Sequence, residues 1–205
     1  MKLHFALASP FARKVRVCAA ELGLDDKIEL LPVQVAPGKP NPEYSGHFNP
    51  LRKIPSLTLN DGSTLFDSAV ICEYLDNQAG GNKLLPGSGD PKRWQVLTDH
   101  ALADGMTELA ILLRYETMLR PEQYRWPLWI EDHWEKIDNG LDWLDKRLDA
   151  SDESFGLGRI ALACLLGYLD FRFAEHDWRK DHGLLSDWYE QMAQRPSMLN
   201  TRPQA

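Results

Sequence analysis

The sequence predicts an α/β domain followed by an all-α domain. Within residues 1–80, short apolar stretches typical of strands alternate with helical patterns in the order β-α-β-α-β-β-α. Residues 81–89 are rich in Pro and Gly, as an interdomain linker is. In residues 90–205 apolar side chains recur every three or four positions, and no strand pattern follows. A chain of 205 residues is long enough for two such domains.

The first elements are a strand, a helix and a second strand. Residues 2–8 alternate in the manner of a strand. Residues 10–22 predict a helix with Ser9 at its N-cap and Pro10 in the first turn, where a missing N–H does no harm. Residues 28–35, rich in Ile, Leu and Val, predict the second strand. Because a helix joins the two strands, a parallel pair is expected.

The remaining elements follow from turn and helix signals. The Asp-Gly pair at residues 61–62, between two β-type stretches, favours a tight hairpin turn. The first domain is completed by a short helix at 42–46, a hairpin of strands at 55–59 and 64–66, and a helix from Asp67-Ser68 to 79–81. Beyond the linker, the predicted helices span 91–119, 121–148, 157–174 and 184–194.

Composition and charge exclude several classes of protein. Apolar residues make up 43% of the chain, and no apolar run is long enough to cross a bilayer, so no membrane role is expected. The net charge is −7 and the acidic residues are spread along the chain, which disfavours nucleic-acid binding. The first residues lack the apolar core and cleavage site of a secretory signal, so a cytoplasmic location is expected.

Neither a metal site nor a disulfide framework is expected. Cys18, Cys72 and Cys164 lie far apart among apolar neighbours, as buried thiols in a reducing compartment do. The spacing of His176 and His182 does not place both rings on one helical face. We therefore expect no bound metal.

Several short motifs occur in a characteristic order. In the first domain they are Ser9-Pro10-Phe11, Ile54-Pro55-Ser56-Leu57 and Asp67-Ser68; in the helical half they are ALADGMTELAILLRYE (101–116), IALACLLGYLDFR (160–172) and RPSMLNTRP (195–203). Together they resemble the cytosolic glutathione transferases, in particular bacterial members with a serine motif, over nearly the whole chain. The resemblance implies a thioredoxin-like first domain, an all-helical second domain and glutathione as co-substrate.

The resemblance gives Ser9 a catalytic role, with Phe11 beside it among the substrate-binding residues. A serine hydroxyl is too weak an acid to attack unaided, and no His or Asp is placed as its base, which disfavours a Ser-His-Asp hydrolase. In the family the nucleophile is the thiol of glutathione, whose pKa a hydroxyl donor at a helix N-terminus lowers. No Cys occurs in the first seventeen residues, which argues against mixed-disulfide chemistry. The alternative is that Ser9 only caps its helix.

Two further motifs are expected to hold glutathione. The resemblance implies that the peptide bond before Pro55 is cis and that the backbone of Ile54 bonds the cysteinyl part of glutathione. It also implies that Ser68 holds the γ-glutamyl carboxylate while Asp67 pairs with the ammonium. The alternative for Asp67 and Ser68 is a simple helix cap.

The helical half is expected to supply the partner contacts and the acceptor pocket. Family members are commonly two-fold dimers, so we expect a homodimer. In that arrangement Asp104 would reach the glutathione of the other subunit, with Asp99 as an alternative. The acceptor pocket is expected to draw on variable helical residues of the second domain such as Met106, Leu109, Leu113 and Tyr115, so the electrophile cannot be read from the sequence.

One departure from the family pattern stands at the predicted helix 157–174. The family commonly caps this helix with Ser or Thr and an Asp three residues later, whereas Gly156 and Arg159 occupy these positions here. The resemblance as a whole implies a transferase that conjugates glutathione to small apolar electrophiles. A non-catalytic glutathione-transferase-like binding or regulatory protein is the alternative, because fold does not dictate function.

Overall fold

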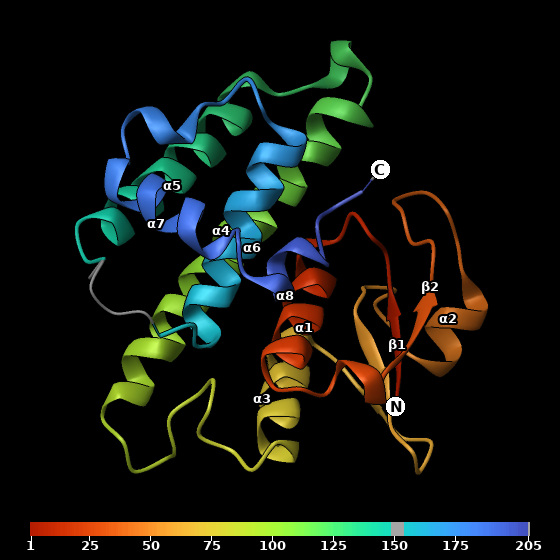
Figure 1. Ribbon diagram of the computed structural model, residues 1–205. Helices are drawn as coiled ribbons and strands as arrows, with labels where there is room; N and C mark the ends of the chain where they lie inside the picture. The colour runs from red at the N-terminus through yellow and green to blue at the C-terminus, as the bar shows by residue number, and fades with distance from the viewer. Residues whose placement is uncertain (149–153, 205) are drawn as a thin grey trace.

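A four-stranded mixed sheet forms the centre of the first domain in the computed structural model, which describes residues 1–148 and 154–204 (Figure 1). The strands are β1 (Lys2–Phe5), β2 (Glu29–Pro32), β3 (Ser56–Thr58) and β4 (Thr64–Leu65), in the spatial order β2-β1-β3-β4. β1 is parallel to β2, and β3 is antiparallel to both β1 and β4. The parallel pair and the hairpin are confirmed, although each strand is shorter than predicted.

Helices lie on both faces of this sheet. They are α1 (Pro10–Glu21), the 3-10 helix η1 (Asp25–Lys27), α2 (Pro42–His47) and α3 (Ser68–Gln78). α1 and α3 pack together between the sheet and the helical half, while α2 lies on the far side of the strands (Figure 1). α1 buries Ala12, Val15 and Cys18 because these residues share one apolar face at helical spacing.

The second half contains only helices among its described residues. They are α4 (Lys92–Met118), η2 (Glu122–Tyr124), α5 (Pro127–Asp145), α6 (Leu157–Arg172), η3 (Trp178–Lys180), α7 (Gly183–Met192) and α8 (Pro196–Leu199). No helix in the described part of the chain is both long and apolar enough to cross a membrane. The sequence did not predict α8 or the 3-10 helices.

The predicted helix at 121–148 is wrong at its start. α5 begins at Pro127, and Trp126 before it is extended, with φ −105° and ψ 100°. A proline ring clashes with a helical conformation of the residue before it, so the helix cannot continue backwards through Trp126.

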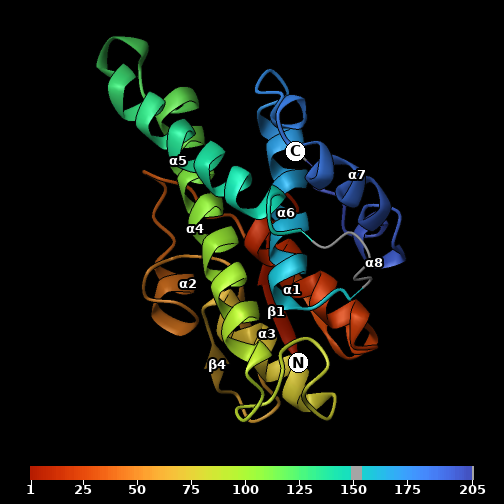
Figure 2. The same ribbon diagram turned by 90° about the vertical axis from the view of Figure 1, so that its left-hand side faces the viewer.

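α6 is the central helix of the molecule. Apart from Arg159, every residue from Leu157 to Leu169 is buried, because α1, α4 and α7 all pack against this helix (Figure 2). Its contact with α1 joins the two halves of the chain. Gly158 lets α4 approach closely, since a Cβ there would lie 3.0 Å from the carbonyl oxygen of Val96.

The start of α6 is held by a backbone bond in place of a side-chain cap. Gly156 makes no capping bond, as its sequence implied. Instead the N–H of Leu157 donates to the carbonyl of Leu84 at 2.8 Å. Asp76, near the end of α3, accepts the N–H of Leu84 at 2.9 Å. The segment between α3 and α4 is thereby fastened to both halves.

Candidate active site

Ser9 lies at the N-cap of α1 with an extended backbone. Its N–H donates to the carbonyl of Ala6 at 3.1 Å, and its Oγ accepts the N–H of Ala12 at 3.2 Å. This capping bond uses a lone pair of the hydroxyl. No described residue accepts the hydroxyl proton, so Ser9 caps α1 and still has a proton to donate. The two roles considered for Ser9 are therefore compatible.

The loop before β3 presents an open segment of backbone. The Ile54–Pro55 peptide bond is cis, as the resemblance implied. The carbonyl of the preceding residue, Lys53, accepts hydrogen bonds from Tyr44 Oη and Asn49 Nδ2, both at 2.9 Å. These bonds fix the loop, whereas the N–H and C=O of Ile54 have no hydrogen-bond partner among residues 1–148 and 154–204.

The start of α3 separates the roles of Asp67 and Ser68. Asp67 is the N-cap, and its Oδ1 accepts the N–H of Ala69 at 2.8 Å. Ser68 is the first helical residue, is only 2% exposed, and its buried Oγ has no hydrogen-bond partner in the described chain. The cap interpretation is thus right for Asp67 and wrong for Ser68, because a serine caps from the position before the first turn.

A buried ionic cluster that sequence reasoning missed connects α1 to α4. Lys14 Nζ lies 2.7 and 2.6 Å from the two carboxylate oxygens of Asp104 and 2.9 Å from Nε2 of His100. The side chain of Lys14 is 2% exposed and that of Asp104 is 21% exposed. A signal for Lys14 was present, since it lies three residues after Phe11 and four before Cys18, on the apolar face of α1.

This cluster lies beside the predicted site residues. The ring of Phe11 is 5.4 Å from Lys14 Nζ, and the negative charge of Asp67 acts on His100. The structure therefore brings Phe11, Asp67 and Asp104 into one neighbourhood. The contact it gives Asp104 is within its own chain, and its role toward a second subunit stays a prediction. Asp99, the alternative, accepts a hydrogen bond from Gln95 at 2.8 Å.

Burial controls the charge of the groups next to this site. Burial, followed by the charge of Lys14, lowers the pKa of His100 to about 4, so its ring is neutral at pH 7. Burial also raises the pKa of the Cys164 thiol to about 11 and that of Cys18 well above its usual value. These thiols stay protonated and are poor nucleophiles.

Part of the expected acceptor pocket is wrong. Met106 and Leu113 are fully buried in the core of the helical half. They face inward because α5 and α6 cover that side of α4; the Cβ of an alanine at position 140 would overlap Met106. Leu109 is partly buried and Tyr115 is exposed. Of the four expected residues, these two are available to a ligand.

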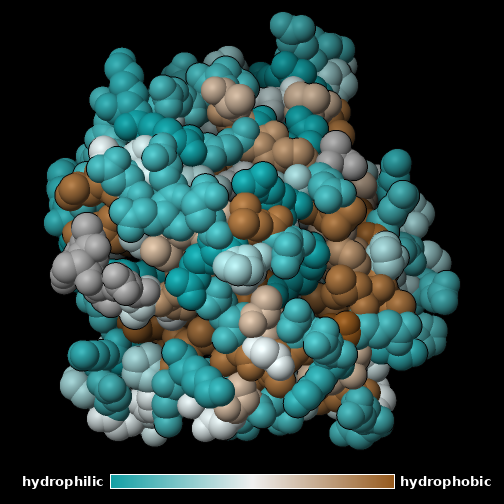
Figure 3. Space-filling model, in the orientation of Figure 1, coloured by the Kyte–Doolittle hydropathy of each residue, from teal (hydrophilic) through white to brown (hydrophobic). Residues whose placement is uncertain are grey.

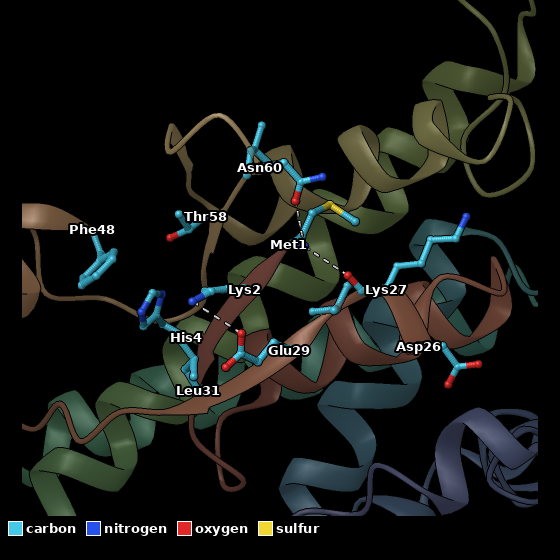
Figure 4. A pocket seen from close by; sticks show the side chains of 12 residues that line it. Met1, Lys2, His4, Asp26, Lys27, Glu29, Leu31, Phe48, Thr58 and Asn60 are labelled. Carbon is cyan, nitrogen blue, oxygen red and sulfur yellow. Dashed lines mark hydrogen bonds and ion pairs between the residues drawn. The ribbon is translucent and has the colours of Figure 1, made fainter.

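Two open surface pockets lie away from the candidate site residues. One, of about 950 Å³, lies over β1 and β2 and is lined by Met1, Lys2, His4 and Phe48 among others (Figure 4). The other, of about 560 Å³, lies between the strands and α8, on the face where Figure 3 shows apolar surface over β1 and β2. Neither is lined by Ser9, Ile54, Asp67 or Ser68, so neither is the candidate site.

The histidines considered as metal ligands have other partners. His176 Nε2 lies 2.9 Å from Asp138, and its ring stacks on Trp134. His182 Nδ1 bonds the carbonyl of Trp178 at 2.6 Å. In the part of the chain that the structure describes, no three His, Cys, Asp or Glu side chains are grouped to hold a metal ion.

Comparison with known proteins agrees with this arrangement. Two family profiles match the chain, that of the glutathione S-transferase N-terminal domain at residues 8–78 and that of the C-terminal domain at residues 127–191. The uncharacterized GST-like protein YibF of Escherichia coli (strain K12) is 32% identical over 208 residues, which cover 99% of this chain and 98% of that protein.

Solved structures extend the similarity. A glutathione transferase family member from Pseudomonas fluorescens Pf-5, with bound glutathione, is 40% identical, with a TM-score of 0.92 over 100% of this chain and 99% of that one. Its complex with S-(propanoic acid)-glutathione has a TM-score of 0.90 over 100% of both chains, at the same identity. A glutathione S-transferase from Methylobacillus flagellatus KT with glutathione bound is 38% identical, with a TM-score of 0.84 over 99% of both chains. The two profiles and the full-length relatives place this chain in the glutathione S-transferase family.

Proposed function

We propose that this protein binds glutathione, stabilises its thiolate with Ser9 and transfers it to a small electrophile. The observation that carries the proposal is the hydroxyl of Ser9, whose proton has no acceptor among the described residues although its oxygen caps α1. A donor at a helix N-terminus favours an anion that lies next to it. A thiolate is the anion that this reaction requires.

The neighbouring groups fit the rest of a glutathione molecule. The unpartnered N–H and C=O of Ile54 suit the backbone of the cysteinyl residue, which would add to the loop like a strand. The unpartnered Oγ of Ser68, at the N-terminus of α3, suits the γ-glutamyl carboxylate. Asp67 uses Oδ1 for its cap and keeps Oδ2 for the ammonium group.

The energy required of Ser9 is of the size that one charged hydrogen bond supplies. Moving a thiol pKa from its free value to near neutrality needs about 2–3 kcal/mol of preferential thiolate stabilisation. A hydrogen bond to a charged group contributes about 1.5–3 kcal/mol, and the helix end adds to it. The thiol proton leaves to solvent, the sulfur forms a bond to the electrophilic carbon, and the displaced electron pair leaves with the leaving group.

The relatives support the same ligand. The family member from Pseudomonas fluorescens binds glutathione, and that from Methylobacillus flagellatus KT does too. The Pseudomonas fluorescens protein also binds glutathione that carries propanoic acid on sulfur. A site that holds such a molecule has space beyond the sulfur for an acceptor.

The test is the ultraviolet absorbance of bound glutathione thiolate, followed against pH in wild type, Ser9→Ala, Ser9→Gly and Ser9→Thr. We expect Ser9→Ala and Ser9→Gly to bind glutathione within a few-fold of wild type and to raise the pKa of the bound thiol by about 1–2 units. Ser9→Thr keeps the hydroxyl and should stay close to wild type.

The variants separate activation from capping. Glycine preserves most of the capping stability and alanine does not. If Ser9 only caps α1, the pKa of the bound thiol should change together with the stability of the variant. The thiol pKa in Ser9→Gly would then equal that in wild type. Binding of glutathione without any conjugation, at every electrophile tried, would favour the alternative of a non-catalytic binding protein.

A further inference from the structure

Two arginines and a tyrosine lie within electrostatic range of one another at the C-terminal ends of α4 and α6. Arg114 is on α4, while Tyr168 and Arg172 lie one turn apart on α6. The charges of both arginines act on the hydroxyl of Tyr168, which is 6% exposed. The two helices start side by side at Gly158 and Val96 and diverge toward these ends (Figure 2).

Arg172, at the end of α6, lies near the end of α1 that carries Ser9. Gly167 meets Arg13 of α1 so closely that a Cβ at position 167 would overlap its guanidinium. Counted from this contact, Ser9 is four residues toward the N-terminus of α1, a distance of about 6 Å along the helix axis. Arg172 is five residues toward the C-terminus of α6, about 7–8 Å along its axis. Because α1 and α6 run in opposite directions, Ser9 and Arg172 lie on the same side of the contact between Arg13 and Gly167 (Figure 1).

The first domain approaches the same region. Tyr115, next to Arg114, is within electrostatic range of Lys53, the residue before Ile54. Lys53 also forms an ion pair with Glu108, one turn before Leu112 on α4, with Nζ and Oε1 3.4 Å apart. Ser9, the loop at Lys53 and the ends of α4 and α6 therefore border one region, into which a group on the sulfur of bound glutathione would extend.

The two arginines have no anionic partner in the described chain. Neither forms an ion pair or a hydrogen bond with a carboxylate of residues 1–148 or 154–204; the guanidinium of Arg172 lies over its neighbour Phe171. Both side chains are half-buried. Burial, and then the like charge of Arg114, lowers the pKa of Arg172. Two partly buried cations held together without a counter-charge make a site that an anion stabilises.

We propose that Arg114 and Arg172, with the hydroxyl of Tyr168, bind a carboxylate on the acceptor substrate. Tyr115, exposed on the same end of α4, supplies apolar surface for the rest of the molecule. The substrate class is then an electrophile with an apolar body and a carboxylate a few bonds from the reacting carbon. This inference rests on the proposed glutathione-transferase function and specifies its acceptor.

An aromatic probe shows how such a reaction balances. In 4-chloro-3-nitrobenzoate the thiolate sulfur forms a bond to the ring carbon that carries chlorine. The carbon–chlorine bond then breaks, and chloride leaves with its electron pair. The carboxylate takes no part in bond making, so Arg114 and Arg172 act as binding residues for the acceptor.

The first experiment measures binding by calorimetry with three ligands: glutathione, S-(2-carboxyethyl)glutathione and S-(2-carbamoylethyl)glutathione. The last two have the same shape and differ by one negative charge. We expect wild type to bind the carboxylate at least about tenfold more tightly than the amide. Arg114→Gln and Arg172→Gln should each remove most of that preference and leave the affinity for glutathione unchanged, while Arg172→Lys should keep part of it.

Arg202→Gln is the matched control, because Arg202 is an exposed arginine on the C-terminal segment. It should keep the full preference for the carboxylate. Circular dichroism establishes whether each variant is folded. If a variant is unfolded, the comparison of the carboxylate ligand with the amide ligand in wild type still tests the carboxylate site.

The second experiment compares kcat/KM for 4-chloro-3-nitrobenzoate with that for its primary amide. Equal values for acid and amide, in a protein that binds glutathione and conjugates both, would overturn the carboxylate site and leave the proposed function standing. No binding of glutathione by wild type would overturn the proposed function itself, and the acceptor site with it.

Discussion

Lys14 and Asp104 form an ion pair that joins the two halves of the chain, with Nζ 2.7 and 2.6 Å from the two carboxylate oxygens. Lys14 is on α1, five residues after Ser9, and Asp104 is on α4. The pair fixes the helix that carries Ser9 against the helical domain. An ammonium group this deeply buried is tolerated only because a carboxylate meets it.

Removal of the carboxylate should therefore destabilise the protein strongly. We expect Asp104→Asn to lower the free energy of unfolding by about 3 kcal/mol, the lower end of the range for a broken buried pair, because Asp104 is one-fifth exposed. Urea unfolding at pH 7 measures this. The double variant Lys14→Met/Asp104→Leu should recover most of the loss, since it leaves no buried charge. A double variant as unstable as the single one would contradict the ion-pair explanation.

His100 predicts a dependence of stability on pH. Its pKa falls from 6.5 in the unfolded chain to about 4 in the folded protein, chiefly by burial. Because the folded state binds a proton less readily, stability is fully present above pH 6.5 and is lost as pH falls toward 4. The loss is about 3 kcal/mol.

The measurement is urea unfolding of wild type and His100→Gln at several pH values between 7 and 4. Glutamine accepts a hydrogen bond from Lys14 and does not titrate, so this variant should lose less stability over the interval. Parallel curves for the two proteins would show that protonation of His100 does not account for the acid loss.

The sequence predicts the first domain in order because its signals are local. Ser9 before Pro10 marks a helix start, and the Asp-Gly turn marks the hairpin, whatever packs around them. The cis bond before Pro55 is implied by the family pattern and is present. The short helix α8 has Pro196 in its first turn but no capping side chain and only four residues, so it depends on contacts with α1, which is distant in sequence.

The missed and mistaken site residues depend on tertiary contacts. Lys14 lies on the apolar face of α1, but a lysine is usually exposed, and only the approach of α4 gives it Asp104 and His100 as partners. Met106 is wrong as an acceptor-pocket residue because α5 covers it. Ser68 remains a possible cap from sequence, which does not distinguish the N-cap from the residue after it.

Ser68→Ala should separate ligand binding from stability. The Oγ of Ser68 has no partner in the described chain, and Asp67 supplies the cap. We expect Ser68→Ala to weaken glutathione binding by more than about tenfold, because a bond to a charged carboxylate is lost. Its unfolding free energy should change by less than about 0.5 kcal/mol.

Asp67→Ala is the contrasting variant. It removes the cap of α3 and should cost about 0.5–2 kcal/mol of stability. Unchanged glutathione affinity in Ser68→Ala, measured by calorimetry, would exclude the hydroxyl from the ligand site.

The predicted homodimer has a direct test in solution. Sedimentation equilibrium at micromolar concentration should give about twice the chain mass of 23.4 kDa. Val70 on α3 and Trp94 in the first turn of α4 expose apolar side chains that a second subunit would cover. Trp94→Glu should then shift the protein toward monomer. A monomeric wild type would overturn both the dimer and the cross-subunit role of Asp104.

Gly156 offers a prediction in which the usual cap rule fails. Serine at an N-cap normally stabilises a helix by about a few tenths of a kcal/mol relative to glycine, so Gly156→Ser, which restores the family's capping residue, would be expected to help α6 slightly. Here a Cβ at position 156 would lie 2.9 Å from the carbonyl oxygen of Leu84, which already accepts the N–H of Leu157. We expect Gly156→Ser to lower the free energy of unfolding by about 1–3 kcal/mol, because the backbone of Leu84 has to move and its bond to Leu157 weakens.

Gly89→Ser is the matched control, since a Cβ at position 89 meets nothing within 4 Å, and it should change stability by less than about 0.5 kcal/mol. A stabilised Gly156→Ser in urea unfolding would mean that the segment at Leu84 yields freely and that the bond from Leu157 is not what holds the start of α6.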